Sequence, residues 1–170
     1  TTRLVGSEMC IRDSIFAEEA GKKINNVLTP KEVIGLVAEL IGDNKDNNSL
    51  CDPVSGSGTL LVEVGKRVGI RGANIFGQEA NWNQYALTKM NLMLNGFKDS
   101  TFFWGDSLSN PKLTDDGGLK RFDIVASIPP FADKWATEEA EFDRYGRFQY
   151  GIPPRSQATW AYISHILASL

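Results

Sequence analysis

The chain has few of the residues that build cross-links or metal clusters, with two cysteines and one histidine among 170 residues. A disulfide framework and a cysteine-rich metal site are therefore disfavoured. No apolar run approaches the length needed to span a membrane. Positive charge is not in excess either, because 18 basic and 21 acidic side chains leave a net charge of −3. This balance argues against a self-sufficient nucleic-acid binder.

What is present is ordinary globular composition, with 42% hydrophobic and 23% charged residues and a length typical of one domain. We therefore expect a soluble, cytoplasmic α/β domain. Residues 1–14 are set apart, because LVGSEMCIRDS resembles the translation of a sequencing adapter, the alternative being a disordered arm. The chain stops inside an apolar helical pattern at Leu170, which predicts a fragment of a longer protein.

Helical and extended patterns alternate along the rest of the chain. A helix is predicted to start at Thr29, which caps it, with Pro30 in its first turn and Glu32 closing a capping box. Further helices are predicted over residues 59–68, over residues 81–94 and from Ser156 onward. The apolar positions of the helix over residues 81–94 are Ala86, Leu87, Met90 and Leu94.

Strands are predicted to end at Asp52 and to cover residues 74–79, 101–106 and 122–127. A turn-rich excursion follows the third strand, and a long loop over residues 132–155 follows the fourth. Strands that alternate with helices form βαβ units, so we expect a parallel sheet with right-handed crossovers. Ligands of such sheets bind beyond the carboxyl ends of the strands.

The first strand leads into Asp52-Pro53-Val54-Ser55-Gly56-Ser57-Gly58. Glycines here permit positive φ and let a ligand approach the main chain, and the helix behind them favours a carboxylate. No lysine follows the last glycine, so this is not a Walker loop, nor is it the spaced dinucleotide fingerprint. A tight turn without a ligand is the alternative.

The other three strand ends also carry informative residues. Glu79 follows the glycines at about the twenty-residue distance at which an acid bonds a ribose diol in such sheets. Asp106, followed by Ser107, could accept a hydrogen bond from an adenine amino group. The alternative is a solvated acid at Glu79 and a helix N-cap at Asp106. Ile128-Pro129-Pro130-Phe131 closes the fourth strand with a rigid turn and a ring that could stack on a flat ligand.

Six segments in order resemble the methyltransferase (modification) subunit of type I restriction-modification systems: TPKEVIGLVAEL, DPVSGSGTLL, GQEANWNQYALTKMNLMLNG, GDSL, FDIVASIPPF and YGIPPRSQATWAYISHIL. The resemblance implies a Rossmann-like fold that uses S-adenosylmethionine, truncated after the fourth strand and its following helix. Residues 15–170 would then be a partial methyltransferase catalytic domain. It further implies methylation of adenine N6 in DNA without a metal, with a specificity subunit and a restriction subunit as partners.

The resemblance also implies a role for each strand end. The loop under the methionine part of the cofactor would comprise Asp52, Pro53, Gly56, Ser57 and Gly58, flanked by Thr29 and Pro30. Glu79 would hold the ribose, and Asp106 with Ser107 the cofactor adenine. The family's fourth motif, Asn-Pro-Pro-Phe or Tyr, receives a flipped adenine; here the catalytic positions are Ile128, Pro129, Pro130 and Phe131.

Position 128 departs from the family, because isoleucine has no side-chain acceptor for the amino group of the target base. A sequencing error, a real loss of activity and a compensating acceptor are the three explanations. Ser127 is expected to point to the opposite face of the strand. A cofactor-binding but silent homologue, and a methyltransferase of this fold acting on RNA or protein glutamine, are therefore the alternative functions.

Three other features bear on function. The loop over residues 133–155 mixes arginines and aromatics and either faces DNA or packs on itself. His165 has no companion for catalysis and is interpreted as structural. Cys51 is interpreted as a small buried hydrophobic residue.

Overall fold

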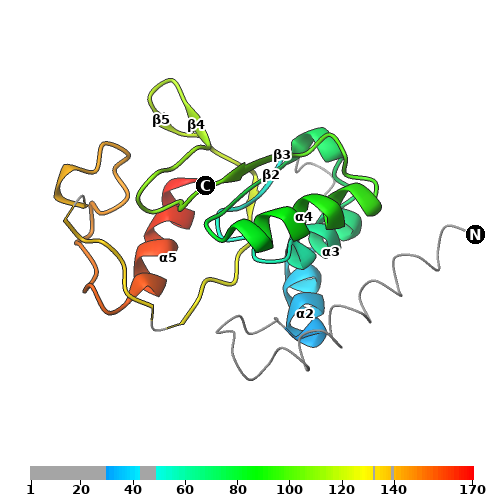
Figure 1. Cartoon of the computed structure of the whole chain (residues 1–170), viewed down its shortest axis with the longest axis horizontal. Helices are drawn as coiled ribbons and strands as arrows, with labels where there is room; N and C mark the ends of the chain where they lie inside the picture. Colours follow the sequence, from blue (N-terminus) through cyan, green and yellow to red (C-terminus); the bar gives the residue numbers. More distant parts are fainter. Residues whose placement is uncertain (1–29, 43–48, 132, 139) are drawn as a thin grey trace, which may run out of the picture.

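The computed structural model describes residues 30–42, 49–131, 133–138 and 140–170 (Figure 1). The segment 1–14 with Cys10, and the predicted cap Thr29, lie outside the described residues. In the described part, no helix is long and apolar enough to cross a membrane.

The centre of the fold is a parallel sheet of four strands: β1 (Leu50–Asp52), β2 (Ile75–Glu79), β3 (Thr101–Trp104) and β6 (Ile124–Val125). Their order is β3-β2-β1-β6, and each neighbouring pair is parallel. The chain therefore runs outward from β1 to β3 and then returns to the other side of β1. A ligand cleft is expected where the direction reverses, at the carboxyl ends of β1 and β6. This topology confirms the predicted α/β parallel sheet.

Three helices group on one side of the strands, and a fourth lies apart from them (Figure 1). The group consists of α2 (Lys31–Ile41), α3 (Thr59–Val68) and α4 (Trp82–Leu94), and the separate helix is α5 (Ala158–Ala168). Leu50 packs with the helices in the main core, whereas its neighbour Cys51 packs on the opposite face with Leu113 and Phe122. The alternation of a β-strand explains this division. The prediction that Cys51 is buried is confirmed.

Three predicted helix starts differ from the structure by one or two residues. The helix α4 begins at Trp82, and Asn81 is its N-cap. The helix α2 begins at Lys31, so Pro30 is its N-cap rather than its first residue, and no side chain caps it. The last helix begins at Ala158 after Gln157, not at Ser156.

The predicted apolar face of α4 is wrong. Met90 and Leu94 are 55% and 52% exposed, whereas Thr88 and Asn91 are buried beside Leu92. The buried polar side chains bond to the loop that follows β1, as described below. Apolar periodicity could not identify this face, because hydrogen bonding to another segment decides it.

The turn-rich excursion contains a small hairpin that we did not predict, formed by β4 (Thr114–Asp115) and β5 (Gly118–Leu119). Asp116 and Gly117 link these strands with φ of 45° and 85°, the two left-handed positions of a type I′ turn. The Asp-Gly pair was the available signal. The fourth sheet strand is shorter than predicted, since only Ile124–Val125 are in the ladder. Short 3-10 helices occur at Gly72–Asn74 (η1) and Ala140–Phe142 (η2).

Candidate active site

The loop after β1 is a closed turn that runs into the N-terminus of α3. Asp52 is 1% exposed and its Oδ1 accepts a hydrogen bond from the Val54 amide at 2.9 Å. The Ser55 hydroxyl donates to the Asp52 carbonyl at 2.8 Å, and the Gly58 amide donates to the Ser55 carbonyl at 2.8 Å. Gly58 is the left-handed N-cap of α3. These bonds define residues 53–58, called here the glycine loop.

The polar face of α4 holds the glycine loop from behind. Thr88 Oγ1 donates to the Gly56 carbonyl at 2.6 Å, and Asn91 Nδ2 donates to the Ser57 carbonyl at 3.1 Å. The approach is so close that a Cβ on Gly58 would lie 2.5 Å from Thr88 Cγ2. Sequence reasoning missed Thr88 and Asn91. The available signal was two polar residues three apart on a helix that faces the sheet.

Glu79, at the end of β2, ties the sheet to the same loop. Its Oε2 accepts from the Gly56 amide at 2.8 Å, and its Oε1 accepts from the Asn81 amide at 2.8 Å. Burial raises the pKa of this carboxyl against these hydrogen bonds, and the negative charge of Asp106 raises it further. Glu79 is therefore a buried carboxylate beside the glycine loop rather than a solvated acid.

The residues after β3 also lie against the glycine loop. The Ser107 hydroxyl donates to the Pro53 carbonyl at 2.8 Å, which joins this segment directly to the glycine loop. Asp106 Oδ1 accepts from the Leu108 amide at 2.8 Å, and its Oδ2 accepts from Ser109 at 3.2 Å. Asp106 thus caps its own turn while remaining half-buried. The cap alternative and a ligand role are both compatible with this geometry.

Three carboxylates therefore gather at one end of the sheet. Burial raises the pKa of Asp52 to about 7; the Val54 amide opposes this rise and the charge of Glu79 adds to it. The Ser127 hydroxyl also faces Asp52 closely enough to lower its pKa, although it completes no hydrogen bond of good geometry. Among the described residues, none of the three carboxylates forms an ion pair. Uncompensated negative charge of this kind favours a cationic ligand.

The fourth strand end lies beside this cluster. Ile128 is half-buried and packs against the main core, whereas Phe131 is 82% exposed. Thr159 of α5 donates to the Pro130 carbonyl at 2.9 Å, which holds the Pro-Pro turn in place. The Pro129 carbonyl accepts no hydrogen bond from any residue that the structure describes. Position 128 thus has an apolar side chain next to an available backbone acceptor.

Residues 8–170 match the family described as N-6 DNA methylase. The chain belongs to this family. The type I restriction enzyme HindI methylase subunit of Haemophilus influenzae is 30% identical over 164 residues, which are 92% of this chain and 35% of that protein. The MjaVIII methylase subunit of Methanocaldococcus jannaschii is 34% identical over 89% of this chain and 28% of its own length. The predicted resemblance is thereby confirmed.

Solved structures agree with this membership of the N-6 DNA methylase family. The type I restriction-modification methyltransferase subunit of Streptococcus thermophilus has a TM-score of 0.73 and 27% identity, over 84% of this chain and 32% of that one. A class I S-adenosylmethionine-dependent methyltransferase of Listeria monocytogenes has a TM-score of 0.66 at 20% identity, covering 86% of this chain and 44% of its own, which shows a shared fold. The fold is thus that of S-adenosylmethionine-dependent methyltransferases. The chain spans about a third of the length of the curated relatives it matches.

The residues of this member of the N-6 DNA methylase family fit the cofactor that the fold implies. S-adenosylmethionine carries a cationic sulfonium and an adenosine. The carboxylate cluster offers negative charge for the sulfonium, and acceptors for the ribose hydroxyls and the adenine amino group. A Cβ placed on Gly56, whose φ is 55°, would meet nothing within 4 Å, so the loop faces open space at this point. Pro30 lies exposed at the start of α2, and no described contact joins it to the glycine loop.

We expect Gly56→Ala to weaken cofactor binding far more than it weakens the fold. The left-handed backbone costs an alanine about 1–2 kcal/mol, while its methyl group would occupy the open space beside the loop. Gly69→Ala is the matched control, because Gly69 has φ of 75° and equally open surroundings at the far end of α3. Thermal melts should show similar losses of stability for the two variants. Calorimetric titration should show a loss of cofactor affinity for Gly56→Ala only. Equal affinities would contradict a ligand at this loop.

The long loop after the Pro-Pro turn both packs on itself and exposes rings. Trp135 is buried and contacts Phe148, whereas Phe142 and Tyr150 are more than four-fifths exposed. Two open hollows of about 590 and 280 Å³ are lined by residues of the segment 137–155, and no strand-end residue lines them. The strand ends, where the carboxylate cluster lies, are therefore the candidate cofactor site.

Tyr162 of α5 is a further residue that sequence reasoning missed. It is half-buried, and its pKa is raised by burial and by the charges of Asp106, Glu79 and Asp133. It packs against the buried cluster that includes Leu108 and Trp135. Tyr162 therefore brings α5 close to the carboxylates, and only the tertiary structure reveals this neighbour.

Proposed function

We propose that this chain carries the cofactor site and the base-binding strand end of an adenine-N6 DNA methyltransferase. It would act as part of the modification subunit of a type I restriction-modification system, beside a specificity subunit and a restriction subunit. One observation carries the proposal: Asp52, Glu79 and Asp106 converge around an open glycine loop in an N-6 DNA methylase. DNA is the proposed substrate, with sequence recognition assigned to the partner.

The chain's own residues would hold the cofactor in three parts. S-adenosylmethionine supplies an electrophilic methyl group on sulfur. The glycine loop with Asp52 would bind the methionine part, assisted by Ser57 and flanked by Thr29 and Pro30. Glu79 would accept hydrogen bonds from the ribose hydroxyls, and Asp106 with Ser107 would recognise the adenine. No metal is invoked.

The Pro-Pro turn would hold the flipped target adenine. The available Pro129 carbonyl would accept a hydrogen bond from N6, and the exposed ring of Phe131 would stack on the base. Thr159 would keep this turn rigid by its bond to Pro130, so that the amino group meets the methyl group in a fixed orientation. Ile128 offers no second acceptor, so we expect this step to be slow.

The proposal is tested on a full-length methylase subunit carrying this sequence, together with its specificity subunit. We expect calorimetry to show binding of S-adenosylmethionine, and mass spectrometry to find methylated adenine N6 in duplex DNA. RNA and a glutamine-containing peptide serve as parallel substrates, because a methyltransferase of this fold acting on either of them is the alternative function. Absence of cofactor binding, or product on RNA or peptide only, would overturn the proposal.

A silent cofactor-binding homologue is the second candidate, favoured by the packing of Ile128 against the core. It differs from the first in one respect, since it predicts cofactor binding with no methyl transfer to any of the three substrates. The comparison of rates with and without an acceptor at position 128, described in the Discussion, separates the two.

A further inference from the structure

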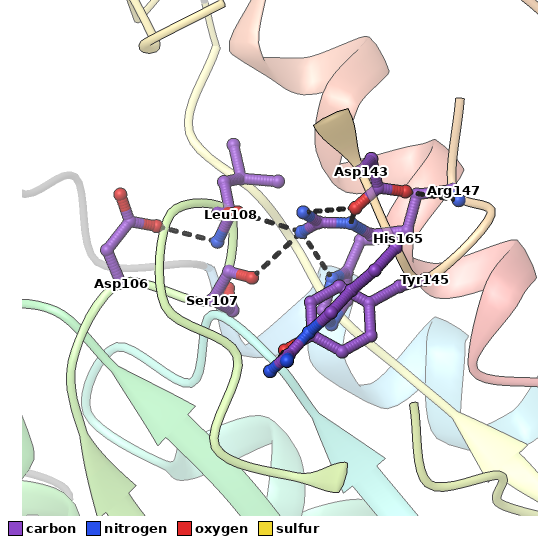
Figure 2. Close-up of polar contacts among 8 residues, drawn as sticks. Asp106, Ser107, Leu108, Asp143, Tyr145, Arg147 and His165 are labelled. Atoms are coloured by element: carbon purple, nitrogen blue, oxygen red, sulfur yellow. Dashed lines mark hydrogen bonds and ion pairs between the residues drawn. The ribbon is translucent and has the colours of Figure 1, made fainter. Parts of the chain in front are cut away.

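Arg147 is a buried arginine that the proposed function does not use, and it lies at the centre of a polar cluster (Figure 2). It lies in the long loop after the Pro-Pro turn, and only 7% of its surface is exposed. Its guanidinium reaches residues from three separate parts of the chain: Asp143 in the same loop, Ser107 and Leu108 after β3, and His165 on α5. Figure 2 shows the guanidinium between these groups.

The geometry accounts for most donors of the guanidinium. Nε and Nη2 both lie 2.8 Å from Asp143 Oδ1, in an ion pair whose side chains are 6% and 4% exposed. Nη1 donates to the Leu108 carbonyl at 2.8 Å and to the Ser107 carbonyl at 3.2 Å. The rings of Tyr145 and Phe148 lie 5.3 and 5.2 Å from the guanidinium carbon. A buried arginine is tolerated only when it is compensated in this way.

His165 supports the same cluster from α5. Its Nδ1 lies 3.4 Å from Nη1 of Arg147, and arginine can only donate, so Nδ1 is the acceptor. Burial and the charge of Arg147 together lower the pKa of His165 to about 3, although the charge of Asp143 opposes them, so the ring is neutral with its proton on Nε2. The interpretation of His165 as a structural residue agrees with this contact.

The two carbonyls held by Arg147 belong to the residues that shape the cofactor site. The Leu108 amide donates to Asp106 Oδ1, and the Ser107 hydroxyl donates to the Pro53 carbonyl of the glycine loop. A shift of this backbone would therefore move the Asp106 carboxylate. It would also weaken the hydrogen bond by which Ser107 joins this segment to the glycine loop. Within the described part of the chain, these two bonds are the hydrogen bonds that join the long loop to residues 106–108.

We propose that Arg147 is a positioning residue that sets the orientation of Asp106 toward the adenine of the cofactor, acting through the Ser107 and Leu108 carbonyls. The proposal rests on the proposed function, since it assumes that Asp106 faces that adenine. It makes the long loop part of the cofactor site. Because α5 holds both His165 and Thr159, one helix would brace the adenine side and the Pro-Pro turn together.

The test compares two ligands in a full-length methylase subunit carrying this sequence. S-adenosylhomocysteine has the 6-amino group that Asp106 would accept from, and S-inosylhomocysteine has an oxygen there instead. The unmodified protein should prefer the adenosyl ligand. In Arg147→Met the preference should fall about tenfold, as expected for the loss of one correctly placed charged acceptor. Arg147→Lys should retain part of it.

Arg155→Met is the matched control, because Arg155 lies in the same loop but forms an exposed ion pair with Glu138. It should leave the preference unchanged. Arg147→Met leaves the buried carboxylate of Asp143 without its ion-pair partner, which can destabilise the fold. The double variant Asp143→Asn with Arg147→Gln removes both charges, so it tests the preference without a buried unpaired charge. Hydrogen exchange of residues 106–109 should accelerate in both variants.

Two results would overturn the proposal. An unchanged preference in a folded Arg147 variant would show a structural role only and would leave the proposed function intact. Failure of the unmodified protein to bind either ligand would defeat the proposed function and this inference with it.

Discussion

Ile128→Asn is expected to raise the methyl-transfer rate of the complete enzyme by about 10²–10³, the usual effect of one preorganised hydrogen-bonding group. The asparagine oxygen would accept from N6 beside the Pro129 carbonyl, so that both amino hydrogens have acceptors and the lone pair faces the methyl group. Affinity for S-adenosylmethionine should not change, because the three carboxylates and the glycine loop are untouched. Single-turnover kinetics on duplex DNA measure the rate.

The matched control is Ile128→Leu, because leucine has the shape of asparagine without its oxygen. Ile128 packs against the main core, so Ile128→Leu should lose little stability and Ile128→Asn should lose more, because it places an amide against apolar side chains. Transfer rates are therefore compared at a temperature at which melts show both variants to be folded. Equal transfer rates for the two variants would show that an acceptor at this position is not what limits the reaction.

A compensating acceptor can be tested in the same assay. Ser127 is the neighbouring candidate, because its buried hydroxyl has no hydrogen-bond partner among the described residues although it faces Asp52. If Ser127 supplies the missing acceptor, Ser127→Ala should abolish the transfer by the unmodified chain. If it does not, the rate at saturating S-adenosylmethionine should stay the same.

Asp52→Asn is expected to weaken S-adenosylmethionine binding about 30-fold or more at pH 8, as for other buried charge pairs that lose one partner. The unmodified protein should bind more tightly as the pH rises through about 7, because burial raises the pKa of Asp52 to that value and only the ionised form attracts a cation. The variant should lack this dependence. Calorimetric titrations at pH 6 and pH 8 measure both effects.

The same substitution should stabilise the cofactor-free protein. The pKa of Asp52 is higher in the folded chain than its ordinary value of 3.8, so the folded state binds more protons between about pH 4 and pH 7. The free energy of unfolding therefore falls as the pH rises through this window. The asparagine side chain carries no charge to bury, and we expect about 2–4 kcal/mol more stability at pH 8 but little gain at pH 4.

Asp99→Asn is the control for both measurements, because this exposed carboxylate precedes β3 and so lies at the opposite end of the sheet. It should change neither affinity nor the pH profile. A stability gain for Asp52→Asn without any loss of affinity would mean that the Asp52 carboxylate takes no part in binding the cofactor.

Local sequence was sufficient for the order of the elements. Short apolar segments that end in Asp52 and Glu79 alternate with helices, and the chain could form only a parallel sheet with these acids at its carboxyl ends. The glycine loop could be predicted for the same reason, because a strand that turns at once into a helix requires residues with little steric restriction. The ligand roles of these residues stay predictions.

Contacts between distant segments could not be predicted in this way. The buried face of α4 was misassigned because Thr88 and Asn91 bond to loop carbonyls more than thirty residues away along the chain. The bonds from Arg147 to Ser107 and Leu108 span about forty residues and join two loops without any periodic pattern. No local signal marks which carbonyl a side chain will reach.

The amino-acid sequence by itself thus determined the family, the parallel sheet and the acids at its strand ends, because these depend on residue types and on spacing along the chain. The tertiary structure alone decided which polar side chains are buried, how far burial raises the pKa of Asp52, and which helix and loop brace the site. Burial and hydrogen bonding depend on neighbours that only folding brings together.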